Sequence, residues 1–242
     1  MDEWVMVERE LIRELLDRVK GRFSVELGIA LDRGEVFPWF LASILYGARI
    51  AESLATRTYQ EFERRGVLSP ERVLETGWEG LVYILDVGGY ARYDFKTATK
   101  LLAVMGTLKE GYDGDLSRLH AEAEDPQDLE RKLMGLGKGV GPVTVNIFLR
   151  ELRDVWQKAD PLPQDLAVLA ARNLGLTQLA DANEGERREI LLELRSMWGK
   201  YPLSGREFAD FETALVRLGK DYCRRRKCVA CPMRDWCTGR DR

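Results

Sequence analysis

The sequence predicts an all-α protein, and three observations carry that prediction. Apolar residues recur at helical spacing along most of the chain. No stretch of four or more residues alternates cleanly between apolar and polar, as a half-buried strand would. Glycine and proline stand where helices are expected to begin or end. With 242 residues, 45% of them hydrophobic, the chain can form one large domain or two smaller ones with their own cores.

The first expected helix is amphipathic, and its apolar stripe contains Leu11, Ile12, Leu15, Leu16 and Val19. Ser69 and Pro70 form a typical helix start, and that helix should end at Gly88-Gly89. Its apolar face is expected to consist of Trp78, Leu81, Val82 and Leu85. Further helical segments are predicted near residues 39–65, 92–108, 127–136, 142–153, 165–174, 186–197 and 205–220.

Charge and hydropathy narrow the class of protein. The net charge of −3 argues against bulk attraction to nucleic acid. Residues 220–242 hold eight Lys and Arg against three Asp, a net +5, so the rest of the chain carries −8. This asymmetry fits either a local phosphate-facing patch or a solvated tail. The apolar run 37–45 is too short to span a bilayer, and the acidic N-terminus lacks the pattern of a secretion signal. We therefore expect a cytoplasmic protein with no membrane partner, and a monomer.

All four cysteines lie close together: Cys223, Cys228, Cys231 and Cys237, separated by four, two and five residues. Thiolates at such spacing can share one metal centre, and zinc and a 4Fe–4S cluster both accept this ligand set. Two disulfides are the alternative, but nothing else in the sequence indicates an oxidising compartment. Spacing alone does not separate iron from zinc. The first gap, residues 224–227, is entirely cationic and could contact phosphates.

A glycine-rich turn joins two apolar helical segments at residues 136–143. Gly139, Val140 and Gly141 should form a tight turn whose backbone can approach a ligand closely. Pro142 suits the first turn of the next helix. The first N–H groups of that helix lack helical acceptors, so a phosphate oxygen can dock there. An ordinary helix–helix connection is the alternative.

A lone aspartate follows the hairpin. Asp165 stands immediately before an apolar helical run and is a candidate N-cap. Capping alone would account for an isolated aspartate at this position. Asp160 is the second candidate for a functional carboxylate, because the length of the preceding loop is uncertain.

Together these features resemble the endonuclease III branch of the helix-hairpin-helix DNA glycosylases, over residues 37–237. Residues 139–146 are similar to the family hairpin, 165–168 to the catalytic aspartate with its helix, and 215–223 to the approach to the cluster. Residues 44–49 and 87–90 look like the segments that carry a DNA-inserting side chain and a wedge. The spacing of the glycines alone is weak evidence for this resemblance. A hairpin, an aspartate and a four-cysteine terminus in this order are specific evidence for it.

The resemblance implies two all-α domains with the active-site cleft between them. A helical barrel domain would comprise residues 32–155, and an iron–sulfur domain residues 1–31 with 156–242. It further implies Asp165 as the catalytic residue, a 4Fe–4S cluster on the four cysteines, and double-stranded DNA with a damaged or mismatched base as the partner. The residues expected to contact DNA are Gly139, Val140, Gly141, Val143, Thr144, Arg49, Gly89 and Tyr90.

The sequence departs from the family pattern at four places. Bifunctional members carry a nucleophilic lysine at the position of Val143, and valine cannot form a Schiff base. The first cysteine gap is shorter than in endonuclease III. Arg49 replaces the usual intercalating glutamine, and the wedge position falls on Gly89, so Tyr90 or Arg92 would have to fill the space in DNA.

The activity implied is hydrolysis of an N-glycosidic bond after the base is flipped out. Asp165, ionised in a desolvated cleft and kept charged by N-cap hydrogen bonds, would stabilise the sugar cation and activate water. A bifunctional glycosylase with AP lyase activity, an inactive DNA-binding homologue and a zinc-stabilised interaction protein are the alternatives. The base is not readable from the sequence. Phe37, Trp39 and Tyr46 could stack on it, although each fits an ordinary core position better.

Overall fold

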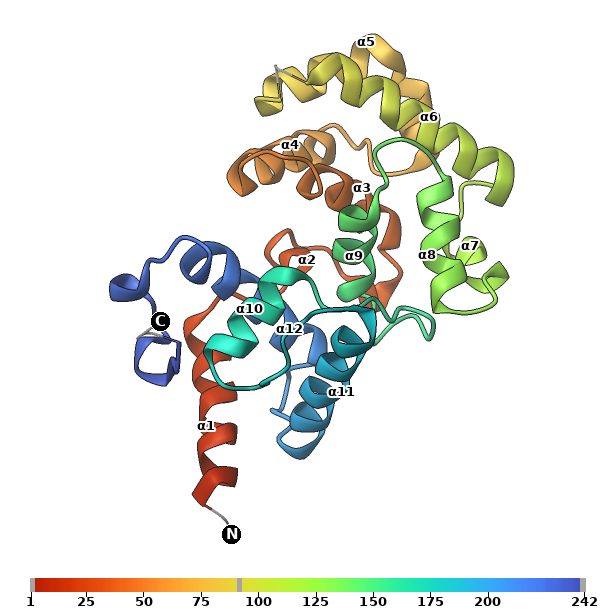
Figure 1. The fold of residues 1–242 in the computed structure, drawn as a ribbon. Helices are drawn as coiled ribbons and strands as arrows, with labels where there is room; N and C mark the ends of the chain where they lie inside the picture. The colour runs from red at the N-terminus through yellow and green to blue at the C-terminus, as the bar shows by residue number, and fades with distance from the viewer. Residues whose placement is uncertain (1–2, 91–92, 240–242) are drawn as a thin grey trace. The chain divides into compact units, whose positions relative to one another are not determined.

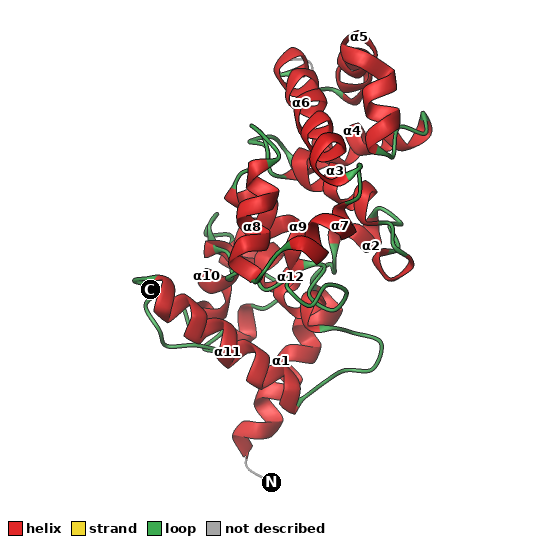
Figure 2. Ribbon diagram, turned by 90° about the vertical axis from the view of Figure 1, so that its right-hand side faces the viewer, coloured by secondary structure: helices red, strands yellow, loops and turns green. Residues whose placement is uncertain are grey.

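The computed structural model describes residues 3–90 and 93–239, and every regular element in these two ranges is helical (Figure 2). The prediction of an all-α protein is therefore confirmed. The chain divides into two compact units. Unit 1 combines Met1–Glu26 with Leu162–Arg242, and unit 2 is Leu27–Pro161; the sequence had suggested boundaries after residues 31 and 155. In the described ranges, no helix is both long enough and apolar enough to cross a bilayer.

In its described residues, unit 2 contains seven α-helices, coloured from orange to green in Figure 1: α3 (Val36–Tyr46), α4 (Glu52–Arg64), α5 (Pro70–Gly88), α6 (Asp94–Tyr112), α7 (Leu116–Glu122), α8 (Pro126–Gly135) and α9 (Pro142–Arg150). Helices α5 and α6 pack side by side, and α3 packs against both α4 and α9. Trp39 is fully buried, and its indole N–H donates to the carbonyl of Phe148 at 3.0 Å. Trp39 is thus a core residue and not a stacking platform.

Two details of unit 2 differ from the predictions. Residues 39–65 form two helices instead of one, separated by a turn at 47–51. The turn begins where Gly47 meets α9: a Cβ added there would lie 2.2 Å from the Thr144 hydroxyl. In addition, α5 is interrupted at Gly77, whose φ of 65° is left-handed. Trp78, directly after the break, is 42% exposed, although Leu81 and Leu85 are buried as predicted.

Unit 1 is built around α12 (Phe208–Leu218), which is buried along its whole length. It contacts α1 (Glu3–Arg18), α10 (Asp165–Asn173) and α11 (Glu184–Lys200). The predicted stripe of the first helix, from Leu11 to Val19, is buried in this core. A π-helical turn, Gly219–Cys223, follows α12 and leads to the cysteines; a Cβ on Gly219 would lie 2.0 Å from the Leu166 carbonyl oxygen. The cysteine segment therefore starts in close contact with α10.

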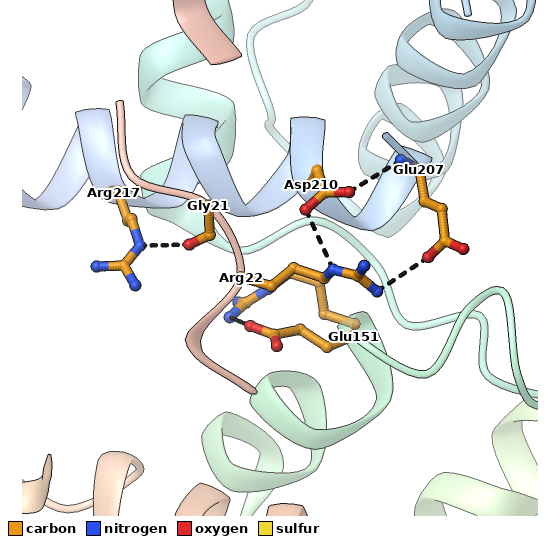
Figure 3. Close-up of polar contacts among 7 residues, drawn as sticks. Gly21, Arg22, Glu151, Glu207, Asp210 and Arg217 are labelled. Atoms are coloured by element: carbon orange, nitrogen blue, oxygen red, sulfur yellow. Dashed lines mark hydrogen bonds and ion pairs between the residues drawn. The ribbon is translucent and has the colours of Figure 1, made fainter. Parts of the chain in front are cut away.

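The short helix α2 (Phe23–Glu26) and the turn before it are tied to α12 by arginines (Figure 3). Arg22 donates through Nε to Asp210 at 3.1 Å and through Nη1 to Glu207 at 2.9 Å. Asp210 also accepts from the backbone N–H of Glu207, which closes a capping box at the start of α12. Arg217 donates through Nε to the Gly21 carbonyl at 2.8 Å. These contacts hold the segment after α1 on the central helix.

The single histidine of the chain provides a test of packing in unit 2. His120 stacks on Trp156 with ring centroids 4.6 Å apart, and its Nε2 accepts from the backbone N–H of Lys158. Burial, and secondarily the charge of Lys158, lowers the pKa of His120 from its ordinary value of 6.5. We expect an NMR titration of this imidazole to have its midpoint below 6.5.

Because the pKa of His120 is lower in the folded than in the unfolded chain, the free energy of unfolding depends on pH. The unfolded chain takes up the proton at higher pH than the folded one, so stability from neutral His120 is complete above pH 6.5 and falls as the pH drops through 6.5 toward the folded pKa. Lys158→Met should raise the midpoint, since one cation is removed. A midpoint at or above 6.5 in the native protein would contradict the stacked, desolvated arrangement.

Candidate functional site

The glycine turn has the predicted helix–turn–helix form. Helix α8 ends at Gly135, the turn spans residues 136–141, and α9 begins with Pro142 in its first turn. Gly139 has a φ of 117°, a conformation that side chains disfavour, and its Cα faces the stem of Lys100 on α6. Lys138 is exposed in the turn. The sequence predicted this element correctly because its signals are local.

The start of α9 offers unpaired backbone donors. Gly141 is the N-cap and has no side chain to accept from the first amides of the helix. The side chains of Val140 and Thr144 are buried, and the Thr144 hydroxyl donates back to the Gly139 carbonyl at 3.2 Å. The expectation that Val140 and Thr144 contact DNA is therefore wrong for their side chains. What the turn presents to a ligand is backbone N–H groups and the exposed side chain of Val143.

The two glycines of the turn make a matched pair for mutagenesis. Gly139→Ala places a side chain at φ 117° and 3.3 Å from Cδ of Lys100, so we expect a loss of about 1–3 kcal/mol of stability and weaker duplex binding. Gly141→Ala is the control, because φ is −94° and a Cβ would meet nothing within 4 Å. Thermal unfolding and duplex affinity measure both. Equal losses in the two variants would show that the turn conformation is not what matters.

The other predicted DNA-contacting residues have different surroundings. Arg49 is exposed in the turn between α3 and α4. Gly89 ends α5 with φ 93°, and a Cβ there would lie 2.8 Å from Leu54 of α4, so the position excludes a wedge side chain. Tyr90 is only 4% exposed, and burial raises the pKa of its hydroxyl. The ring is part of the core, and the expectation that Tyr90 fills a gap in DNA stays an untested prediction. Arg92 lies outside the described residues.

Asp165 is placed differently from the prediction. It is the first residue of α10, and the N-cap is Gln164, which makes no side-chain cap hydrogen bond. The Asp165 side chain is 86% exposed and lies 2.9 Å from Nη1 of Arg187. The expected N-cap role is therefore wrong, because Gln164 is the N-cap residue, whereas the desolvated environment of Asp165 stays a prediction. The carboxylate sits at the positive end of α10 with a guanidinium beside it.

Arg187 of α11 is the neighbour that sequence reasoning missed. Two of its nitrogens, Nε and Nη2, donate to the Asp181 carboxylate at 2.7 and 2.6 Å, which leaves Nη1 for Asp165. This paired geometry, with Asp181 first, raises the pKa of Arg187. The six-residue spacing of Asp181 and Arg187 matches no helical pair, so no sequence signal announced it. Arg187 thus fixes the orientation of the Asp165 side chain.

Asp160, the second candidate carboxylate, belongs to unit 2. Its Oδ1 lies 3.0 Å from Nη1 of the buried Arg153, whose other nitrogen donates to the Pro161 carbonyl. The carboxylate therefore holds a loop in place.

The four cysteines lie on a loop anchored to the core of unit 1. The carbonyl of Asn173 accepts from the backbone N–H groups of Thr238 and Gly239, and Met233 is fully buried in the same core. None of the four cysteines forms a disulfide in this structure. Burial raises the pKa of Cys223, and the other three thiols raise it further. Burial likewise raises the pKa of Cys231.

The thiols fit a metal by their chemistry but are not assembled around one. They are four unbridged sulfur donors that influence one another electrostatically, which a bound cation would relieve. Across residues 3–90 and 93–239, however, no group of three or more His, Cys, Asp or Glu side chains is arranged to hold one ion.

Comparison of the sequence with protein-family models gives no match, and no curated protein is significantly similar to it. A function therefore has to be inferred from the fold, the geometry of these residues and the sequence motifs.

Proposed function

We propose that this protein is a DNA glycosylase that hydrolyses the N-glycosidic bond of a damaged or mismatched base, without strong AP lyase activity. The observation that carries the proposal is the hairpin: Gly139 in a left-handed conformation, followed by the uncapped start of α9. Free N–H groups at a helix start are a general phosphate site, and the resemblance in the sequence points to DNA as the source of the phosphate. The exposed Arg49 turn belongs to the same unit.

Val143 supports hydrolysis over lyase chemistry. Its exposed side chain stands on the first turn of α9, where a lysine would be needed to attack the sugar. With valine there, water is the nucleophile. Its oxygen bonds to the anomeric carbon of the sugar, the base leaves with the electron pair of the broken bond, and the departing base takes up a proton. The product is an abasic site, and an alkylated purine or a deaminated base suits this reaction.

Asp165 is the proposed catalytic carboxylate in unit 1. It accepts the proton of the attacking water and stabilises positive charge on the sugar. Because the side chain is open to solvent, a substrate must cover it before these electrostatic effects reach full strength. Arg187 would orient the carboxylate, and Asp160, which pairs with the buried Arg153, remains the second candidate.

The proposed cofactor is a 4Fe–4S cluster held by Cys223, Cys228, Cys231 and Cys237. When bound, the cluster would fix the loop that carries the cationic residues 224–227. We expect anaerobically purified protein to be brown and to contain iron and sulfide, and Cys228→Ser to lose both together with part of the thermal stability of unit 1. A colourless protein with one zinc per chain would instead favour the alternative of a zinc-stabilised loop.

A panel of duplex oligonucleotides tests the proposed function. Each duplex carries one lesion: an alkylated purine, uracil or thymine in a mismatch, or an oxidised base. Alkali-labile abasic sites should accumulate with one class of lesion, and borohydride should trap no covalent adduct. Trapping would establish the bifunctional alternative. Tight binding without base release on any lesion would establish the alternative of an inactive homologue.

A further inference from the structure

A groove on unit 2 takes no part in the proposed hydrolysis. It lies between α5 and α6, encloses about 350 Å³, and is lined by Trp78, Phe95, Lys96, Thr99 and Lys100. Two of the five lining residues are lysines and none is acidic. We refer to it as the Trp78 groove.

The aromatic rings of the groove are exposed and held in position. Trp78 is 42% and Phe95 58% exposed, and their ring centroids are 5.2 Å apart. The indole N–H of Trp78 donates to the Thr99 hydroxyl at 3.1 Å, and that hydroxyl donates to the Phe95 carbonyl at 2.9 Å. Trp78 directly follows the break in α5 at Gly77. Two large apolar rings are therefore fixed at the surface without a covering segment in the described chain.

The lysines of the groove are available for an anion. Lys96 and Lys100 are four residues apart on α6, so they share one face of the helix. Both are exposed, and neither makes an ion pair with a carboxylate of the described chain, in contrast to Lys109 further along α6, which pairs with Glu71 at 2.9 Å. Outside residues 220–242 the chain carries a net −8, so this pair of free cations stands out against an acidic background.

The groove also borders the hairpin. The stem of Lys100 lies against Gly139, where an added Cβ would be 3.3 Å from Cδ and 3.6 Å from Cβ of the lysine. A strand whose phosphate docks on the start of α9 therefore passes the side chain that closes the groove. The groove and the phosphate-binding amides form adjacent parts of one unit.

We propose that the Trp78 groove binds an unpaired nucleotide of single-stranded DNA, with the base stacked on Trp78 and Phe95 and the phosphates on Lys96 and Lys100. Exposed aromatic rings beside free cations are how proteins bind single strands with little sequence preference. The assignment of DNA rests on the proposed function, but binding at the groove requires no catalysis. A proline-rich peptide would use the rings and leave both lysines without a partner, so the observations favour a nucleotide.

Fluorescence anisotropy with labelled single-stranded oligothymidylate tests the proposal on the full chain. Trp78→Ala and Phe95→Ala should each weaken binding by roughly tenfold, the size of losing one base stack, and Trp78→Phe should retain most of the affinity. Lys100→Ala should weaken binding and reduce the salt dependence by about one unit in the log–log slope. All the substituted side chains are exposed, and circular dichroism checks folding.

Matched controls come from the same two helices. Tyr83 of α5 is 58% exposed, as Phe95 is, but lies outside the groove, and Lys109→Ala removes the same charge as Lys100→Ala. Neither control should change oligothymidylate affinity by more than about twofold, since neither removes a groove contact. No binding by the wild type, equal losses in Tyr83→Ala, or Trp78-dependent binding of a proline-rich peptide instead of DNA would each overturn the proposal.

The outcome separates this proposal from the proposed function. If oligothymidylate binding depends on Trp78 but no lesion is released, the groove proposal holds and the glycosylase proposal fails. If bases are released but Trp78→Ala and Lys100→Ala leave oligothymidylate binding unchanged, the glycosylase proposal holds and the groove proposal fails.

Discussion

Asp165→Asn is expected to reduce base release by at least about 100-fold, because the amide can neither accept the proton of water nor stabilise a sugar cation. DNA affinity should stay the same or rise slightly, since a negative charge near phosphates is removed. The substitution is isosteric and the side chain is exposed. We therefore expect a stability change of about 1 kcal/mol or less, from the surface ion pair with Arg187 and the helix dipole. Single-turnover base release and duplex affinity are the measurements.

Glu184→Gln is the matched control for that experiment. Glu184 is an exposed carboxylate in the first turn of α11, also in unit 1, so its loss changes charge and helix-dipole interactions in the same way. Base release should be unaffected. Wild-type rates in Asp165→Asn would remove Asp165 from the mechanism, and equal losses in both variants would indicate a general electrostatic effect. Arg187→Gln should give an intermediate rate, because the carboxylate remains but loses its fixed neighbour.

The elements that could be predicted from sequence are those with local causes. The hairpin follows from Pro142, which sets the first turn of a helix, and from a glycine where φ must be positive. Ser69 caps α5 by accepting from the backbone N–H of Arg72, as the Ser-Pro pair indicated. The all-α architecture follows from periodicity over long windows, which averages out single errors.

The predictions that failed depend on contacts between distant segments. Apolar residues continue through positions 47–51, so periodicity showed no break, whereas the close contact of Gly47 with Thr144 involves residues far apart in sequence. Tyr90 looked like a loop residue and is buried. Trp78 was assigned to the same core face as Leu81 and Leu85 by helical spacing, but its ring is exposed and contacts Phe95 of α6, which lies far away in sequence.

The site of unit 1 illustrates the same limit. The sequence placed Asp165 at a helix start correctly to within one residue, but neither its exposure nor its partner Arg187 could be read from spacing. The four cysteines were expected to share one metal because they are close in sequence, and that expectation stays a prediction. In the described residues they are unbridged and belong to no group of three or more metal-ligating side chains.

Arg217→Met is expected to cost about 3 kcal/mol of stability in unit 1, at the lower end of what breaking a buried ion pair costs. The Arg217 side chain is 2% exposed, donates to Glu26 at 2.6 Å and to the Gly21 carbonyl, and lies 3.7 Å over the ring of Phe23. Methionine fills the volume but leaves the carbonyl without its donor. Because Glu26 is partly exposed, water can solvate its stranded charge, which places the loss at the lower end.

Urea unfolding of unit 1 measures this loss, and two further variants define its origin. Arg13→Met removes an exposed arginine of α1 that pairs with Glu10 on the same helix, and it should change stability by about 0.5 kcal/mol or less. Arg217→Met with Glu26→Gln should recover part of the loss, because no unpaired charge remains. A loss in Arg217→Met no greater than in Arg13→Met would show that the segment 19–26 is not held on α12 by this arginine. The π-helical turn after α12 ends at Cys223, so loosening the segment 19–26 should also lower retention of the proposed cluster. Stability and cluster content should therefore fall together in Arg217→Met, and both should stay near wild type in Arg13→Met.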